Sequence, residues 1–311
     1  MIIDTHAHLF SWDIPAKPYW DMTAKVWVEL FGGGRTVEEV KGKIPRLFDT
    51  LGDKLVSDMD EGGIDKSVIL LIDYMTGGVE DSFSLEEQHR VYARAVERHP
   101  DRLIFFAGVD PRRPDAVDFL PRAVKEWNVK GVKLHPSVGW YPNEPCAYRV
   151  YEKCRELGLP VLIHSGPEIP PMYQKYADPV FFDEIATDFF PDLKIIMAHA
   201  GMSEWEEAAL LGGSNPNLYF DFAGWQKFYI ALPEEEFYRR IRVCLNLCRG
   251  PRFFFGSDWP ILTRMRHLNH ADWTNVFKEA PERAWKYGIE FSEEEISGIL
   301  GGNVAKLLGL S

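Results

Sequence analysis

The sequence predicts an α/β fold, a (β/α)8 barrel that forms one domain over residues 1–311, and two observations support this prediction. Short apolar runs rich in Val, Ile and Phe recur eight times along the chain, and amphipathic stretches typical of helices lie between most of them. Continuous apolar runs are typical of strands buried on both faces, as in a parallel sheet. An open doubly wound sheet is the alternative, but no glycine-rich phosphate loop follows the first run.

The predicted strands and helices alternate along the chain. The eight strands are expected at residues 2–8, 67–72, 103–109, 131–135, 161–164, 194–199, 218–222 and 253–257. Amphipathic helices are expected at residues 84–98, 115–127, 147–157 and 183–190. Asp115, Asp178 and Ser203 are suitable N-cap residues for helices.

An aromatic and glycine-rich segment at residues 10–45 follows the first strand and interrupts this repeat. A long insertion after a barrel strand lies on the face where barrel enzymes have their active sites. We therefore expect a lid or a pocket wall, and the alternative is an ordered surface loop with buried aromatic side chains.

The composition excludes several classes of protein. With 47 acidic and 35 basic residues the formal net charge is −12, which argues against nucleic-acid or anionic-membrane partners. No apolar run approaches the roughly 20 residues of a membrane helix, and the N-terminus lacks signal-peptide features. None of the four cysteines forms a CxxC pair, which argues against a disulfide scaffold. We expect a cytoplasmic protein with a small-molecule substrate, and a homo-oligomer is possible.

Polar side chains that can bind metals follow the apolar runs. Five of the nine histidines end predicted strands, and an aspartate follows the last strand; they are His6, His8, His135, His164, His199 and Asp258. His6 and His8 point to the same side, because residues i and i+2 of a strand share a face. With His164 and Asp258 they form a nitrogen-rich set that suits Zn²⁺, and also Mn²⁺, Fe²⁺ or Co²⁺. Each residue alone is as well explained by a buried hydrogen-bonded histidine or a helix cap, and the joint pattern carries the prediction.

Stretches in the same order resemble the amidohydrolase superfamily, in its amidohydrolase-related branch (amidohydrolase family 2). They are IDTHAH at 3–8, GVKLHP at 131–136, VLIHSG at 161–166, FPDLK at 190–194, AHAG at 198–201, NLYFD at 217–221, FGSDWP at 255–260 and NVAKLL at 303–308. The resemblance implies a distorted TIM barrel and a divalent metal. It implies that His6, His8 and His164 are metal ligands, that Asp258 is a ligand or a base, and that His199 acts on the water or the substrate.

The fourth strand departs from the two-metal members of the superfamily, which have a carboxylated lysine there. Lys133 and His135 both lie near that position and point to the same side. We expect one metal ion, with Zn²⁺ favoured, and we expect Lys133 and His135 to bind substrate. A nearby carboxylate that pairs with Lys133 is the alternative.

Two reactions fit this set of residues. The leading hypothesis is hydrolysis by a metal-activated water, with Asp258 as the base and His199 orienting the water or stabilising the oxyanion. The second is non-oxidative decarboxylation of an aromatic or muconate-type acid, in which His199 or Asp258 handles the proton. A TatD-type DNase would have a glutamate on the fourth strand, and the charge of −12 also disfavours it. An inactive barrel is disfavoured because every expected site position has a competent residue.

Overall fold

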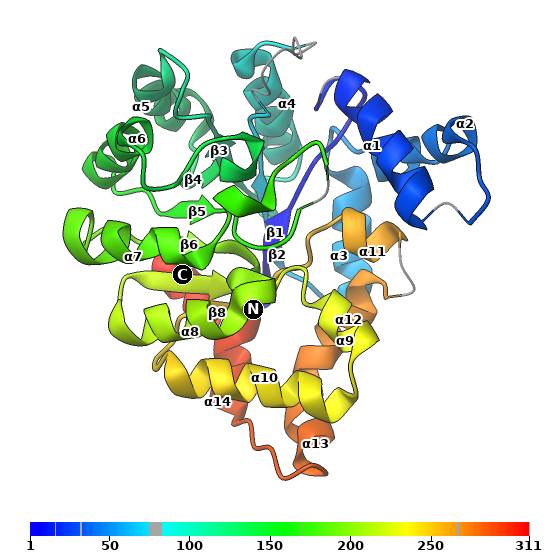
Figure 1. Ribbon diagram of the computed structural model, residues 1–311, viewed down its shortest axis with the longest axis vertical. Coiled ribbons are helices and arrows are strands. Elements are labelled where there is room, and N and C mark those ends of the chain that lie inside the picture. Colours follow the sequence, from blue (N-terminus) through cyan, green and yellow to red (C-terminus); the bar gives the residue numbers. More distant parts are fainter. Residues whose placement is uncertain (16, 32, 75–82, 169, 266–267, 311) are drawn as a thin grey trace.

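Eight parallel strands form the centre of the molecule (Figure 1). The computed structural model describes the chain except residues 16, 32, 75–82, 169, 266–267 and 311, and for 17, 18, 31, 264 and 265 it describes the backbone alone. Each strand pairs with the next one along the chain. The strands are β1 (Ile3–Ala7), β2 (Lys66–Leu70), β3 (Leu103–Gly108), β4 (Gly131–Leu134), β5 (Val161–Ile163), β6 (Ile195–Met197), β7 (Leu218–Asp221) and β8 (Phe253–Phe254).

The segment that follows β8 closes the sheet into a barrel against β1. The amide of Thr5 donates to the carbonyl of Phe255 at 3.0 Å, and the amide of His8 donates to the carbonyl of Trp259 at 2.8 Å. The predicted (β/α)8 barrel in one α/β domain is therefore confirmed, and each predicted strand overlaps one observed strand.

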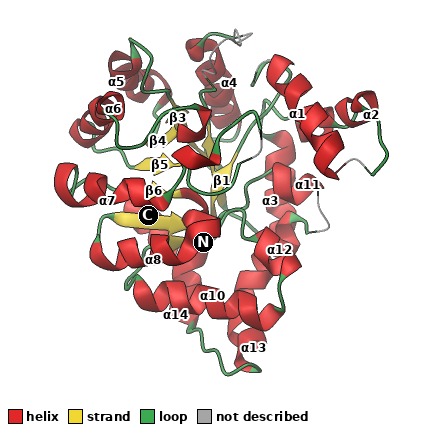
Figure 2. Ribbon diagram, in the orientation of Figure 1, coloured by secondary structure: helices red, strands yellow, loops and turns green. Residues whose placement is uncertain are grey.

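Helices surround the barrel (Figure 2). They are α1 (Lys17–Phe31), α2 (Val37–Lys41), α3 (Asp53–Gly62), α4 (Leu85–Arg98), α5 (Ala116–Trp127), α6 (Pro145–Glu156), α7 (Phe182–Glu184), α8 (Trp205–Ser214), α9 (Gln226–Ala231), α10 (Glu234–Leu247), α11 (Ile261–Met265), α12 (His270–Lys278), α13 (Ala280–Trp285), α14 (Glu293–Ser297) and α15 (Asn303–Leu308).

Three of the four predicted helices coincide with α4, α5 and α6 within two residues at each end. The fourth is a single α-turn, α7, followed by a wider π-helical turn at Ile185–Phe189. Asp178 caps a 3-10 turn, since its side chain accepts from the amide of Val180. Ser203 lies inside a 3-10 segment, Ala198–Glu204, and caps no helix, so that expectation was wrong.

A small apolar cluster from the strands packs inside the barrel and against α15. It contains Val68, Phe106, Leu162 and Phe254 of the strands and Leu307 of α15. This cluster fills the barrel interior. The polar side chains near the carboxyl ends of the strands are not part of it, and they can form a site at that end of the barrel. No helix in the described part of the chain has the length and apolar character that crossing a membrane requires.

The insertion at residues 10–45 forms α1, α2 and a short 3-10 turn that begins at Ile44. Phe10, Tyr19, Trp20 and Trp27 are buried, and the indole of Trp20 donates to the carbonyl of Ser11 at 2.7 Å. Tyr19, Trp20 and Trp27 also line the main cavity, so this segment supplies one of its walls.

Candidate active site

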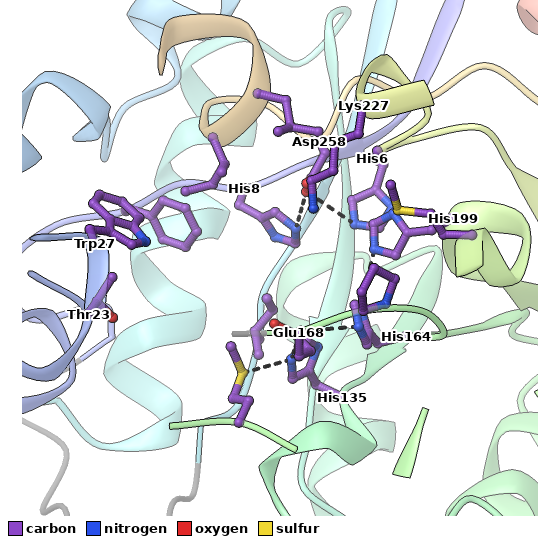
Figure 3. A pocket seen from close by; sticks show the side chains of 18 of the residues that line it. His6, His8, Thr23, Trp27, His135, His164, Glu168, His199, Lys227 and Asp258 are labelled. Atoms are coloured by element: carbon purple, nitrogen blue, oxygen red, sulfur yellow. Dashed lines mark hydrogen bonds and ion pairs between the residues drawn. The ribbon is translucent and has the colours of Figure 1, made fainter. Parts of the chain in front are cut away.

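A cavity of about 700 Å³ lies at the carboxyl ends of the strands. The histidines predicted from the strand ends lie on one side of it, and Thr23 and Trp27 of α1 lie across from them (Figure 3). Its size is that of an ordinary small-molecule site. A cavity of about 150 Å³ already holds benzene, so this one accommodates more than a single ring.

His6, His8 and Asp258 lie close together at this cavity. Oδ1 of Asp258 lies 3.8 Å from Nε2 of His6 and 3.6 Å from Nε2 of His8. One donor atom from each of the three lies within 4.8 Å of the other two, a grouping able to hold a metal ion. Strand alternation therefore predicted the shared side of the two histidines correctly, since their ring centroids are 5.0 Å apart.

His199 links this group to His164. The ring of His199 lies 4.8 Å from that of His6, and its Nε2 lies 3.2 Å from Nδ1 of His164. His164 also belongs to a second group of donor atoms, with His135 and Glu168. The four expected ligands and His199 thus line one cavity.

The ring nitrogens that face away from the cavity are held by acceptors. Nδ1 of His6 lies 3.0 Å from Oδ2 of Asp221, and Nδ1 of His8 lies 2.8 Å from the carbonyl oxygen of Leu70. Nδ1 of His199 lies 2.9 Å from the carbonyl oxygen of Ala223. Because these oxygens only accept, each Nδ1 carries the proton and each Nε2 has a lone pair. This arrangement is typical of metal-binding histidines.

Burial keeps the imidazoles of His6, His164 and His199 neutral. It lowers the pKa of His6 and of His164 well below 6.5, and that of His199 to about 4. Burial alone would raise the pKa of Asp258, but the surrounding imidazoles of His8, His6 and His199 hold that pKa well below its usual range. Neutral imidazoles and an ionised carboxylate are the forms that bind a metal.

The backbone reverses at two of the site residues. His199 and Asp258 have φ values of 59° and 54°, in the left-handed region that non-glycine residues seldom adopt. Glycines allow the close packing around them: a Cβ at Gly224 would lie 3.2 Å from Nδ1 of His199, and one at Gly256 would lie 2.9 Å from the Cβ of Ala223. Strained backbone of this kind is found preferentially at functional sites.

Lys133 and His135 both lie at the cavity, as strand alternation predicted. Only 1% of Lys133 is exposed, and its Nζ has no hydrogen-bond partner among the residues that the structure describes. Burial lowers its pKa to about 8, although the carboxylates of Asp221, Asp258 and Glu168 oppose the shift. The alternative to substrate binding is that Lys133 pairs with a nearby carboxylate. Among the described residues, no carboxylate forms a hydrogen bond with Lys133.

Two acidic residues at the site were missed by the sequence reasoning. Asp221 ends β7 and holds His6, and the signal that could have found it is the one used for Asp258, an aspartate after an apolar run. Glu168 lies in the loop after β5, and its Oε1 is 2.9 Å from Nε2 of His135 and 3.1 Å from Nε2 of His164. Nothing in the local pattern marks Glu168, because its contacts depend on the path of the loop.

Several known proteins are similar to this chain in sequence or in fold. The chain is 21% identical to a 2-amino-3-carboxymuconate-6-semialdehyde decarboxylase of Dictyostelium discoideum, over 99% of this chain and 91% of that protein. A manganese-bound dihydroxybenzoic acid decarboxylase from Polaromonas sp. JS666 has a similar fold, with a TM-score of 0.67, 18% identity and coverage of 99% and 97%. A probable 2-pyrone-4,6-dicarboxylic acid hydrolase from Acinetobacter baumannii also has this fold, with a TM-score of 0.63, 18% identity and 99% coverage of each chain.

The resemblance carried by the sequence motifs extends over nearly the whole chain. The sequence profile of the family described as amidohydrolase matches residues 3–310. The chain therefore belongs to the amidohydrolase family.

Proposed function

We propose that this protein is a metal-dependent, non-oxidative decarboxylase of an aromatic or muconate-type carboxylic acid. The observation that carries the proposal is the buried amine of Lys133, which has no hydrogen-bond partner among the described residues and lies at the same cavity as the histidines and Asp258. A buried cation with no hydrogen-bonded partner, at a cavity with an aromatic wall, suits a carboxylate on a flat molecule. The likeness to two decarboxylases supports decarboxylation rather than hydrolysis.

The donor set fits a divalent metal ion. Three imidazole nitrogens, from His6, His8 and His164, and the carboxylate of Asp258 suit Zn²⁺, and Mn²⁺ is also suitable. The Polaromonas relative binds manganese, so the expected preference for zinc remains a prediction. When bound, the ion supplies Lewis-acid charge that polarises the oxygens of a substrate.

The residues of the chain would bind the acid and deliver a proton. The ammonium group of Lys133 offers its charge to the substrate carboxylate, and the rings of Phe10 and Trp20 line the space for a planar body. Decarboxylation breaks the bond to the carboxyl carbon, and its electron pair stays on the substrate carbon, which takes a proton as CO₂ leaves. Asp258, whose carboxylate is ionised, or His199, whose Nε2 has a lone pair, would first accept a proton from water and then pass it to that carbon.

Hydrolysis is the second candidate, and a specific observation favours it. The ionised carboxylate of Asp258 lies beside Nε2 of both His6 and His8, where it could accept a proton from a bound water. The same residues therefore support either reaction, and the substrate decides between them.

A combined metal and product assay tests the proposal. Natively purified protein is analysed for its metal content and screened for CO₂ release from dihydroxybenzoates and muconate-type acids, with lactones and esters as the hydrolysis panel. We expect CO₂ release that depends on a stoichiometric divalent metal and is lost with chelation. Turnover of lactones without CO₂ release would establish hydrolysis instead, and full activity without metal would refute both reactions.

Three variants refine this test. His6→Ala combined with His8→Ala should lose both metal and turnover, whereas His199→Ala should keep the metal and lose turnover. His99→Ala is the matched control, because His99 pairs with Asp53 at 2.8 Å on the surface. Full activity of the His199 variant would disprove the role proposed for that residue.

A further inference from the structure

Glu168 is a largely buried carboxylate between two histidines. It lies four residues after His164, in the loop that follows β5, and 12% of its side chain is exposed. Its Oε1 is 2.9 Å from Nε2 of His135 and 3.1 Å from Nε2 of His164 (Figure 3). Among the described residues no Lys or Arg forms an ion pair with it, so its close partners are the two imidazoles.

The position of this carboxylate determines where the ring protons lie. An oxygen of a carboxylate repels a nitrogen lone pair and attracts an N–H group, so Nε2 of each imidazole carries the proton. The contact with His164 is not aligned as a hydrogen bond, and its effect is electrostatic. With the proton on Nε2, the lone pair of His164 is on Nδ1.

Nδ1 of His164 faces another lone pair. It lies 3.2 Å from Nε2 of His199, whose own proton is on Nδ1 because Nδ1 faces the carbonyl oxygen of Ala223 at 2.9 Å. Two lone pairs at this distance repel each other unless a positive charge lies beside both. Without Glu168 the proton of His164 could move to Nδ1 and donate to His199, which would remove that nitrogen from a metal.

We propose that Glu168 is a positioning residue that makes His164 present Nδ1, while His6 and His8 present Nε2, to a metal ion. His135 holds Glu168 in place through the 2.9 Å contact. The inference rests on the proposed metal site, but it concerns a residue outside the ligand set. Carboxylates that hold a metal-binding histidine in this way typically contribute 10–100-fold to metal affinity.

Metal affinity of the intact protein tests this role. The affinity for Zn²⁺ is measured by competition with a chelator in the wild type, Glu168→Ala and Glu168→Gln, with Glu290→Gln as the control because Glu290 is exposed. We expect Glu168→Ala to bind Zn²⁺ roughly 10–100-fold more weakly. Glu168→Gln should lose less, since its amide oxygen can still accept from Nε2, and the control should match the wild type.

A spectroscopic measurement separates positioning from a general loss of structure. The visible absorption of the Co²⁺-loaded protein reports the number and type of ligands, and we expect Glu168→Ala to resemble His164→Ala. Affinity and spectrum unchanged in both Glu168 variants would overturn the inference while leaving the metal site intact. A wild type that binds no divalent metal would overturn the proposed function itself. If Glu168→Ala fails to fold, the Zn²⁺ affinity and the Co²⁺ spectrum of the isosteric Glu168→Gln variant test the inference instead.

Discussion

Lys133 combines a charge with almost complete burial. Its pKa is lowered from 10.5 to about 8 by burial, and this difference corresponds to about 3 kcal/mol of unfavourable free energy for the charged form. The described residues offer Nζ no hydrogen bond in return. A buried charge that destabilises the fold by this amount is expected to be retained where it binds a ligand, here a substrate.

Lys133→Met should therefore stabilise the protein and weaken its binding of acids. We expect a gain of about 1–3 kcal/mol in the free energy of unfolding at pH 7, because an apolar chain of similar length replaces the buried charge. In the wild type the folded state holds fewer protons than the unfolded state between pH 8 and 10.5, so stability should rise over that range. Urea unfolding at pH 7 and pH 9.5 measures both effects. A less stable variant that keeps this pH dependence would contradict the account.

Asp221→Asn should weaken metal binding without removing any proposed ligand. Oδ2 of Asp221 faces Nδ1 of His6 at 3.0 Å, and Oδ1 accepts from the amides of His199 and Ala223. All three partners are donors, so an asparagine must turn its NH₂ group toward one of them. We expect a roughly 10–100-fold loss of metal affinity by chelator competition. The exposed Asp192→Asn is the control, and equal affinity in the two variants would disprove the role.

At the scale of elements, the turn after β6 positions His199. Residues 199–202 all have positive φ values, and three of the four are not glycine. Such a run costs free energy at each non-glycine residue and is retained where the chain needs an abrupt reversal. It brings the ring of His199 between those of His6 and His164.

Helix α4 contains a buried histidine that should make the protein sensitive to acid. His89 is fully buried beside Phe119 and Trp127 of α5, and burial lowers its pKa to about 4. In the unfolded chain His89 binds a proton near pH 6.5, but in the folded chain it stays neutral at that pH. The stability that the folded protein has with a neutral His89 is therefore fully present above pH 6.5. It is lost as the pH falls toward 4, by about 3 kcal/mol.

His89→Leu should flatten this acid dependence. We expect the difference in unfolding free energy between pH 7 and pH 4.5 to shrink by about 2 kcal/mol, because leucine has no proton to gain. Denaturant unfolding at the two pH values measures this difference. An unchanged acid dependence would place the sensitivity elsewhere, for example in the buried histidines of the site.

At the scale of the molecule, closure of the barrel assembles the site. His6 on β1 and Asp258 after β8 lie at opposite ends of the sequence, and the hydrogen bonds from Thr5 and His8 to the segment after β8 bring them together. An unfolded chain cannot keep such residues in place, so a metal should bind the folded protein preferentially.

Added metal should consequently raise the melting temperature. At a free metal concentration of 100 times Kd the folded state gains about 2.7 kcal/mol, which corresponds to several degrees for a chain of this size. Thermal unfolding with and without Zn²⁺ or Mn²⁺, in the wild type and in His6→Ala with His8→Ala, measures the effect. No shift in the wild type, or an equal shift in the double variant, would contradict this site.

The barrel and most of the candidate site follow from local features of the amino-acid sequence. Apolar runs and strand alternation are local properties, so they predicted the eight strands and the shared side of His6 and His8. Parallel strands all end at one edge, and this rule extended the prediction to His164, His199 and Asp258.

The groups that support that site depend on how distant parts of the chain pack together. Asp221 and Glu168 act through contacts with residues whose positions depend on how strands and loops pack, and no local period encodes those contacts. The protons on His6, His8 and His199 follow from acceptors on other strands or turns. The position of α1 at the cavity wall also depends on packing. An insertion has no repeating sequence pattern that fixes its position, and it lies where it packs against the rest of the protein.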